Sequence, residues 1–194
     1  MRIPWLLACI VAPLAGQGVV TGVVRSGDVR VAGAVVWLEP LDAPPPVQVP
    51  DTVMMDQRGL EFLPGRWALR PGDVVVFPNS DPLRHNVFSP GLRGGAGAFN
   101  LGTYPRGEIR EHAFTEPGAH VILCHIHPDM LAWIVVAASP WRAIVAADGR
   151  FQFTDVPPGR YRLHTWHARA HAASVPVRVE GPRGPSVTID LVRP

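Results

Sequence analysis

The sequence predicts an all-β protein built from two small domains. Prolines and glycines, 22 and 19 of the 194 residues, recur throughout the chain and punctuate valine-rich stretches, a pattern typical of strands joined by turns. The strand-like segments are short, as in a β-sandwich or barrel. The chain is long enough for one large or two small domains with buried cores.

Residues 1–17 are predicted to be a secretory signal peptide. Arg2 precedes an apolar run over residues 3–14, and small residues follow, which is the pattern of a cleaved export signal. No other segment is long and apolar enough for a transmembrane helix. We therefore expect an exported, periplasmic protein in which cleavage removes Cys9 and leaves Cys124 as the remaining cysteine.

The charge of the chain argues against two classes of partner. The formal net charge is +2 at pH 7, and all 18 basic residues are arginine. So small a net charge predicts neither nucleic acid nor an anionic membrane surface as a partner.

The first two thirds of the chain are predicted to contain two strand-forming segments separated by one linker. Residues 18–42 form two strands joined by a Gly27-Asp28 turn, and the proline-rich residues 43–50 form a stiff, extended linker. Residues 51–137 then form a domain of short strands. We expect these strands at residues 53–55, 66–69, 74–78, 86–89, 109–114, 120–124 and 132–138.

Residues 138–194 are predicted to form a second β-sandwich. An Asp148-Gly149 turn joins two strands, and Pro157-Pro158-Gly159 precedes another. The "DGRF…VPPGRY" pattern resembles carboxypeptidase regulatory-like, or transthyretin-like, domains. The opening strands of such domains resemble "VTGVV…VAGAVVWL", which here lies at residues 20–38. We expect residues 18–42 and 138–194 to form one sandwich with residues 51–137 inserted; the alternative is two domains in series.

A metal site is indicated by the stretch "LCHIHPDML" at residues 123–131. Cys124 and His127 offer a thiolate and an imidazole, which together favour copper, zinc or iron. Structural zinc usually takes four ligands with more than one cysteine, and a thioether such as Met130 suits copper better. A blue-copper site needs a second histidine from elsewhere in the chain.

The candidate for the second histidine is His85, in "GDVVVFPNSDPLRHNVFS" at residues 72–89. This segment resembles the cupredoxin family, in which an Asn-x-Asp turn leads to a His-Asn pair, and "CHIHPDM" resembles the amicyanin ligand loop. The resemblance implies a Greek-key sandwich and one mononuclear type 1 copper held by His85, Cys124, His127 and Met130. It also implies that Asn86 hydrogen-bonds to the cysteine loop. Met54 and Met55 are rival axial ligands.

The chain as a whole also resembles bacterial proteins labelled methylamine utilization protein-like. The shared segments are "MDQ…F.P" at residues 55–64, "FPNSD…HNVFS", the "C-x-I-H-x-x-M" loop and a C-terminal Trp-His pair. Membership implies no particular role in methylamine metabolism.

The expected function is one-electron transfer, without substrate turnover, between redox protein partners or envelope proteins. Electrons would pass through His127, in an apolar patch with Pro90, Leu92 and Pro128. The first alternative is a copper carrier for homeostasis. The others are a structural envelope module and a copper-dependent oxidoreductase.

An oxidoreductase would need a second copper. His125 adjoins Cys124, but strand alternation points it away from the site. Other candidates by residue type are His112, His120, His164, His167 and His171.

Overall fold

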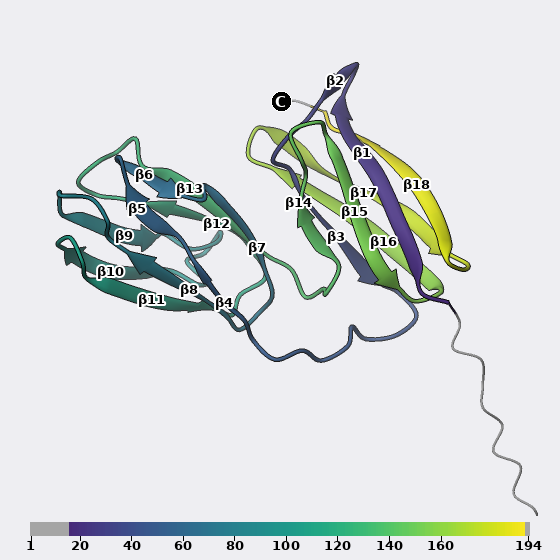
Figure 1. Ribbon diagram of the computed structural model, residues 1–194, viewed down its shortest axis with the longest axis horizontal. Helices are drawn as coiled ribbons and strands as arrows, with labels where there is room; N and C mark the ends of the chain where they lie inside the picture. The colour runs from purple at the N-terminus through teal and green to yellow at the C-terminus, as the bar shows by residue number, and fades with distance from the viewer. Residues whose placement is uncertain (1–15, 193–194) are drawn as a thin grey trace, which may run out of the picture.

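The computed structural model describes residues 16–192 and shows an all-β protein without helices in that range. The predicted signal peptide lies, except for its last two residues, outside the described part, as does Cys9. Two β-sandwiches lie next to each other, and an extended segment over residues 41–51 connects them (Figure 1). Within the described residues, no helix is long and apolar enough to cross a membrane.

The split sandwich contains both the first and the last strands of the chain. One sheet has the order β15-β1-β18 with β2 paired to β1, and the other has the order β14-β3-β16-β17. β1 and β18 are parallel neighbours although they come from opposite ends of the chain (Figure 1). The strands are β1 (Gly18–Ser26), β2 (Val29–Arg30), β3 (Val35–Pro40), β14 (Arg142–Ile144), β15 (Arg150–Val156), β16 (Gly159–His167), β17 (Ala170–Val179) and β18 (Arg183–Asp190).

The middle sandwich is formed by the intervening strands. Its sheets have the orders β10-β9-β12-β13-β7 and β11-β8-β4, and β5 and β6 pair as a separate hairpin. The strands are β4 (Thr52–Met54), β5 (Asp56–Arg58), β6 (Glu61–Leu63), β7 (Arg66–Leu69), β8 (Asp73–Pro78), β9 (His85–Ser89), β10 (Phe99–Tyr104), β11 (Ile109–Phe114), β12 (Gly118–Leu123) and β13 (Leu131–Val136). Each sandwich has its own hydrophobic core, because alternate residues of its strands point inward.

Three details of the strand prediction were wrong. The segment after the Gly27-Asp28 turn is interrupted at Gly33, whose φ of +70° bends the chain between β2 and β3. β10 was missed because it follows a glycine-rich loop and contains Gly102 at φ +72°. The β5–β6 hairpin was missed because its residues are mostly polar and its strands have three residues each.

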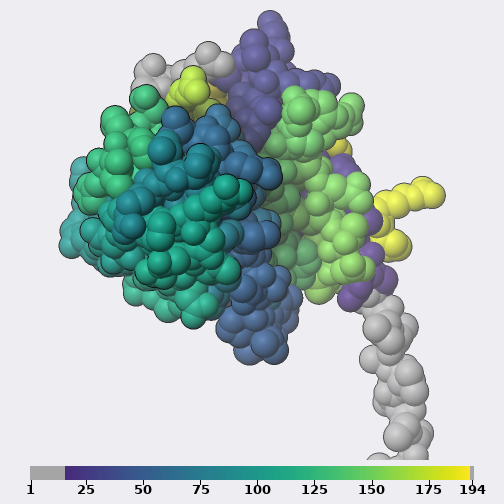
Figure 2. Space-filling view, turned by 60° about the vertical axis from the view of Figure 1, so that its left-hand side comes forward, coloured from purple at the N-terminus to yellow at the C-terminus, as the bar shows by residue number. Residues whose placement is uncertain are grey.

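The two sandwiches meet through the outer faces of their sheets. Val35 and Val135 are 0% and 2% exposed, yet they belong to neither hydrophobic core. The rings of Trp133 and Trp166 lie 4.9 Å apart between their centroids across the same contact. Figure 2 shows the two sandwiches pressed together over an extended boundary. The apolar residues of this boundary are therefore buried by the neighbouring sandwich.

A buried carboxylate, Asp73, joins the linker and both sandwiches. It accepts hydrogen bonds from the backbone amides of Asp51 and Arg70, both at 2.8 Å, and lies 3.4 Å from Nη2 of Arg142 in the split sandwich. Arg142 also donates from Nε to the Ala68 carbonyl on β7, the edge strand opposite β14. Burial would raise the pKa of Asp73, but the hydrogen bonds from Asp51 and Arg70 lower this pKa on balance.

The half-buried His112 predicts a pH dependence of stability. Its ring stacks on Phe99 at 3.9 Å between centroids, and both burial and the neighbouring His120 lower the pKa of His112 below 6.5. The unfolded chain therefore takes up this proton first as pH falls, so the folded state loses stability from about pH 6.5 downward.

We expect His112→Gln to flatten the dependence of the unfolding free energy on pH between about pH 7.5 and about pH 5.5. The measurement is urea unfolding at several pH values in that interval. His171→Gln, which removes an exposed histidine, is the matched control and should retain the wild-type slope. An unchanged slope in His112→Gln would contradict the prediction.

Candidate metal centre

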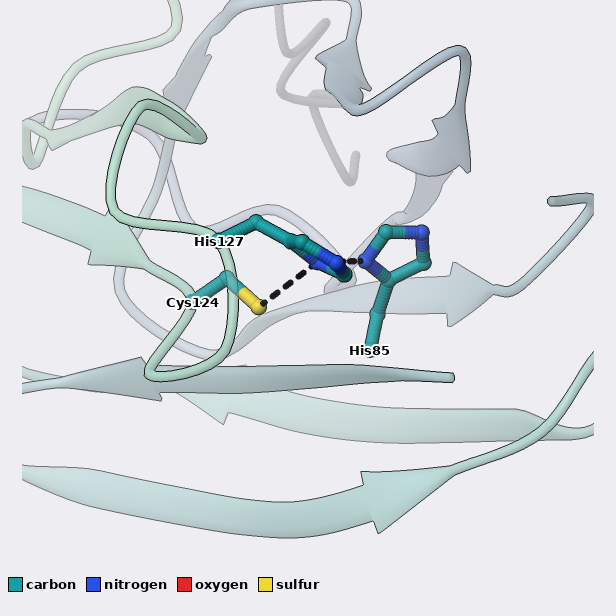
Figure 3. A group of neighbouring side chains, drawn as sticks. All are labelled: His85, Cys124 and His127. Carbon is teal, nitrogen blue, oxygen red and sulfur yellow. Dashed lines mark hydrogen bonds between the residues drawn. The ribbon is translucent and has the colours of Figure 1, made fainter. Parts of the chain in front are cut away.

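Three predicted ligands meet at one end of the middle sandwich (Figure 3). The Sγ atom of Cys124 and a ring nitrogen of each of His85 and His127 all lie within 4.8 Å of one another. Nδ1 of His127 lies 3.8 Å from Sγ of Cys124 and 3.0 Å from Nδ1 of His85. His85 and Cys124 are 0% and 4% exposed, whereas His127 is partly exposed.

The strand pairing explains why these residues meet. β9 and β12 are antiparallel neighbours in one sheet, with Leu123 opposite Phe88. His85 is the first residue of β9, and Cys124 directly follows β12. The two residues therefore lie at the same end of the sheet. Only seven residues join β12 to β13, and the chain turns directly after His127, where the Met130 amide donates to the His127 carbonyl at 3.0 Å. His127 therefore stays close to the cysteine.

The donor set fits a soft or borderline metal ion. Metal–nitrogen and metal–sulfur bonds are about 2.0 and 2.3 Å long, so donor atoms 3.0 to 3.8 Å apart can share one ion. A thiolate with two imidazoles suits copper. The cluster of His85, Cys124 and His127 could therefore hold one copper ion.

Met130, the fourth predicted ligand, lies in the core next to this loop. It is 1% exposed and belongs to the same buried cluster as Cys124. The rival Met54 is 58% exposed on β4, in the opposite sheet, which does not suit a ligand of a buried ion. The rival Met55 is buried in the same core as Met130.

Asn86 connects the two ligand-bearing segments. Its backbone amide donates to Sγ of Cys124 at 3.4 Å, and its side-chain oxygen accepts from the His125 amide at 3.4 Å. Its Nδ2 donates to Asn100 on β10 at 2.8 Å, which holds the side chain in place. An N–H group directed at the sulfur stabilises a thiolate, so Asn86 suits the role that the resemblance implied.

His125 turns away from the ligands, as alternation along β12 predicted. Its exposed ring stacks on Phe88 at 3.6 Å between centroids. Within residues 16–192, the three ligands form the one group of three or more His, Cys, Asp or Glu side chains at metal-ligand distance. The other candidate histidines do not gather into a second such group in this range.

The expected apolar patch around His127 was wrong for Pro90, which directly follows the far end of β9, and for Leu92. This side chain packs against Gly118, at the start of β12, whereas Cys124 follows the opposite end of that strand. The exposed large hydrophobic residues closest to the ligands in the chain are Leu83, Ile126 and Leu131, and the predicted patch residue Pro128, next to His127, is also exposed. Leu92 lies elsewhere because the loop at residues 90–98 follows the far end of β9.

Asp81, the aspartate of the Asn-x-Asp turn, contacts the predicted ligand His85, a role that the sequence analysis did not assign to it. Its Oδ2 lies 2.7 Å from Nε2 of His85, so the carboxylate can hold that nitrogen as the N–H donor and leave Nδ1 free as a ligand. Burial would raise the pKa of Asp81, but hydrogen bonds from Leu60, Gly59 and His85 lower this pKa on balance. The sequence signal that could have predicted this contact is a carboxylate four residues before a proposed histidine ligand.

We expect Asp81→Asn to weaken copper binding by about 10- to 100-fold, because a carboxylate partner orients a histidine ligand and raises its basicity. Competition with a chromophoric chelator measures this affinity. The matched control is Asp28→Asn, at an exposed turn of the split sandwich, which should bind copper as the wild type does. Equal affinities in the two variants would refute a role for Asp81.

Comparisons with known proteins give structural likenesses only. No protein-family model and no curated protein matches the chain. The solved structures similar to it include cupredoxins. A reduced Cu(I) form of an amicyanin mutant is 23% identical, with 44% of this chain and 82% of that chain covered and a TM-score of 0.41. A purple cupredoxin from Nitrosopumilus maritimus is 22% identical, with coverages of 44% and 99% and a TM-score of 0.39.

A Cu-containing nitrite reductase from Thermus scotoductus SA-01 is also similar. It is 27% identical, with 51% of this chain covered and a TM-score of 0.42. The match spans 25% of the reductase chain.

Proposed function

We propose that this chain is a type 1 copper protein that transfers single electrons between redox partners. The observation that carries the proposal is the gathering of one buried thiol and two imidazole nitrogens within 4.8 Å. Such a set, completed by a weak thioether, is the ligand chemistry of blue-copper electron-transfer sites.

Each residue has a role in this proposal. Cys124 binds as a thiolate, and His85 and His127 bind as neutral imidazoles through Nδ1. Met130 would supply a weak thioether as fourth ligand, which would tune the potential. Copper, when bound, supplies the Cu(II)/Cu(I) couple. Electrons enter and leave through His127, because it is the partly exposed member of the ligand cluster.

The location and partners are also part of the proposal. The chain is exported to the periplasm, its signal peptide is cleaved, and it exchanges electrons with redox proteins rather than turning over a substrate. The split sandwich is proposed to be a carboxypeptidase regulatory-like domain that holds a partner or part of the cell envelope. The sequence patterns at residues 20–38 and 148–161 support this assignment.

The optical and EPR spectra of the copper-loaded protein test the proposed function. We expect intense thiolate-to-copper absorption in the visible range, narrow copper hyperfine splitting and reversible reduction. A colourless protein that holds only Cu(I) and exchanges it with chelators would instead indicate a copper carrier. A protein that binds no copper would leave a structural role.

A further inference from the structure

The β5–β6 hairpin lies against the segment that carries His85. Its two strands form a separate sheet of three residues each, too small to be stable alone. Met55 and Phe62, 0% and 2% exposed, anchor it in the core of the middle sandwich. At its tip, Gly59 and Leu60 both have positive φ angles, of 66° and 62°, as in the tight turns of hairpins.

The hairpin holds the turn before His85 by its backbone. The Gln57 carbonyl accepts hydrogen bonds from the amides of Ser80, at 3.0 Å, and Asp81, at 3.1 Å. In return, the amides of Gly59 and Leu60 donate to the two carboxylate oxygens of Asp81, at 2.7 and 3.0 Å. Both the backbone and the side chain of Asp81 are therefore held by one short hairpin.

The Gln57 side chain connects the hairpin to the strands on either side of the site. It is fully buried, and its Nε2 donates to the Tyr104 hydroxyl at 2.5 Å and to the Pro78 carbonyl at 3.2 Å. Tyr104 pairs with His85 across β10 and β9, and its hydroxyl donates to the Phe77 carbonyl. Oε1 of Gln57 is buried without a partner, which is costly for stability alone.

We propose that the β5–β6 hairpin is a clamp that positions His85 before any metal binds, with Gln57 and Tyr104 as positioning residues. Asp81 can direct Nδ1 of His85 toward Cys124 and His127 only while its own carboxylate is fixed. The amides of Gly59 and Leu60 fix it, and Gln57 and Tyr104 hold the hairpin that carries those amides. The inference rests on the proposed copper function for its purpose, but the clamp itself exists in the metal-free protein.

The test is nitrogen-15 NMR of the histidine rings in the metal-free, full-length protein. In the wild type we expect His85 in the Nε2–H tautomer, with an Nε2 proton that exchanges slowly with water. Tyr104→Phe removes one anchor of Gln57 and should speed this exchange by up to about tenfold, as expected for the loss of one buried hydrogen bond. Gln57→Leu removes both side-chain anchors and should speed it further and populate the other tautomer.

Tyr161→Phe is the matched control. Tyr161 is 4% exposed in the split sandwich, and its hydroxyl likewise donates to a backbone carbonyl, that of Pro157, at 2.8 Å. This variant should leave the His85 signals unchanged. In copper-loaded samples, Tyr104→Phe should also change the copper hyperfine splitting, which a loss of stability alone would not do.

Two results would overturn the clamp: an Nδ1–H tautomer of His85 in the wild type, or wild-type exchange in a folded Tyr104→Phe variant. If Gln57→Leu does not fold, the His85 tautomer of the wild type and the proton exchange in Tyr104→Phe still test the clamp. A locked Nε2–H tautomer in a protein that takes up no copper would refute the proposed function and retain the clamp.

Discussion

Replacing Cys124 with serine is expected to abolish the visible thiolate-to-copper absorption and to weaken copper binding by at least about 100-fold, the upper range for changes at groups that merely orient ligands. A serine hydroxyl is a hard donor that stays protonated at neutral pH, so it cannot replace a soft, anionic thiolate. The fold should survive, because Cys124 lies at the end of β12 and the bond that its sulfur accepts from the Asn86 amide can also be accepted by a hydroxyl.

The optical and EPR spectra of Cys124→Ser, loaded with copper beside the wild type, measure this effect. His125→Gln is the matched control, since it changes the adjacent residue, whose ring stacks on Phe88 rather than facing the ligands. The control should keep the wild-type colour. If Cys124→Ser keeps the same colour and hyperfine pattern, the proposed ligand set is wrong.

Replacing Asp73 with alanine is expected to lower the free energy of unfolding by about 3–5 kcal/mol, as is typical when one partner of a buried ion pair is removed. The Asp73 side chain is 1% exposed, and those of its partners Arg70 and Arg142 are each 17% exposed. The variant leaves both guanidinium groups without this partner and the amides of Asp51 and Arg70 without their acceptor. Because Arg142 belongs to the split sandwich, we also expect the two sandwiches to unfold in separate transitions.

Urea unfolding measures the loss of unfolding free energy, and calorimetry shows whether the two sandwiches unfold in separate transitions. Asp148→Ala is the matched control: it breaks an ion pair with Arg150 whose side chains are 65% and 60% exposed, and should cost at most about 1 kcal/mol. A loss equal to that of the control would contradict the importance of the buried pair. The lowered pKa of Asp73 adds a second check. Its stabilising contribution should be present above the unfolded value of 3.8 and be lost as pH falls through the lower, folded pKa.

Local sequence patterns predicted the three residues that gather at the candidate metal centre, His85, Cys124 and His127. Cys124, His127 and Met130 lie within seven residues and offer soft donors, and His85 stands in a recognisable turn-and-strand context. Alternation along β12 correctly predicted that Ile122 and Cys124 point inward and that His125 points away.

Contacts between distant segments were harder to predict. The role of Asp81 was not predicted, because the amides that hold its carboxylate, those of Gly59 and Leu60, lie more than twenty positions earlier. The β5–β6 hairpin carries few apolar residues, so no strand periodicity marks it. Leu92 was placed in the wrong patch because its position depends on the path of a glycine-rich loop.

The sequence by itself determined the β architecture and the ligand types, because turn residues, strand alternation and donor chemistry are properties of short segments. Only the tertiary structure decided which distant groups meet: β1 with β18, Val35 and Val135 at the boundary between the sandwiches, Asp73 with Arg142, and Asp81 with the amides of Gly59 and Leu60. Such pairings depend on packing and on the partners that buried polar groups find. A single sequence carries no local mark of either.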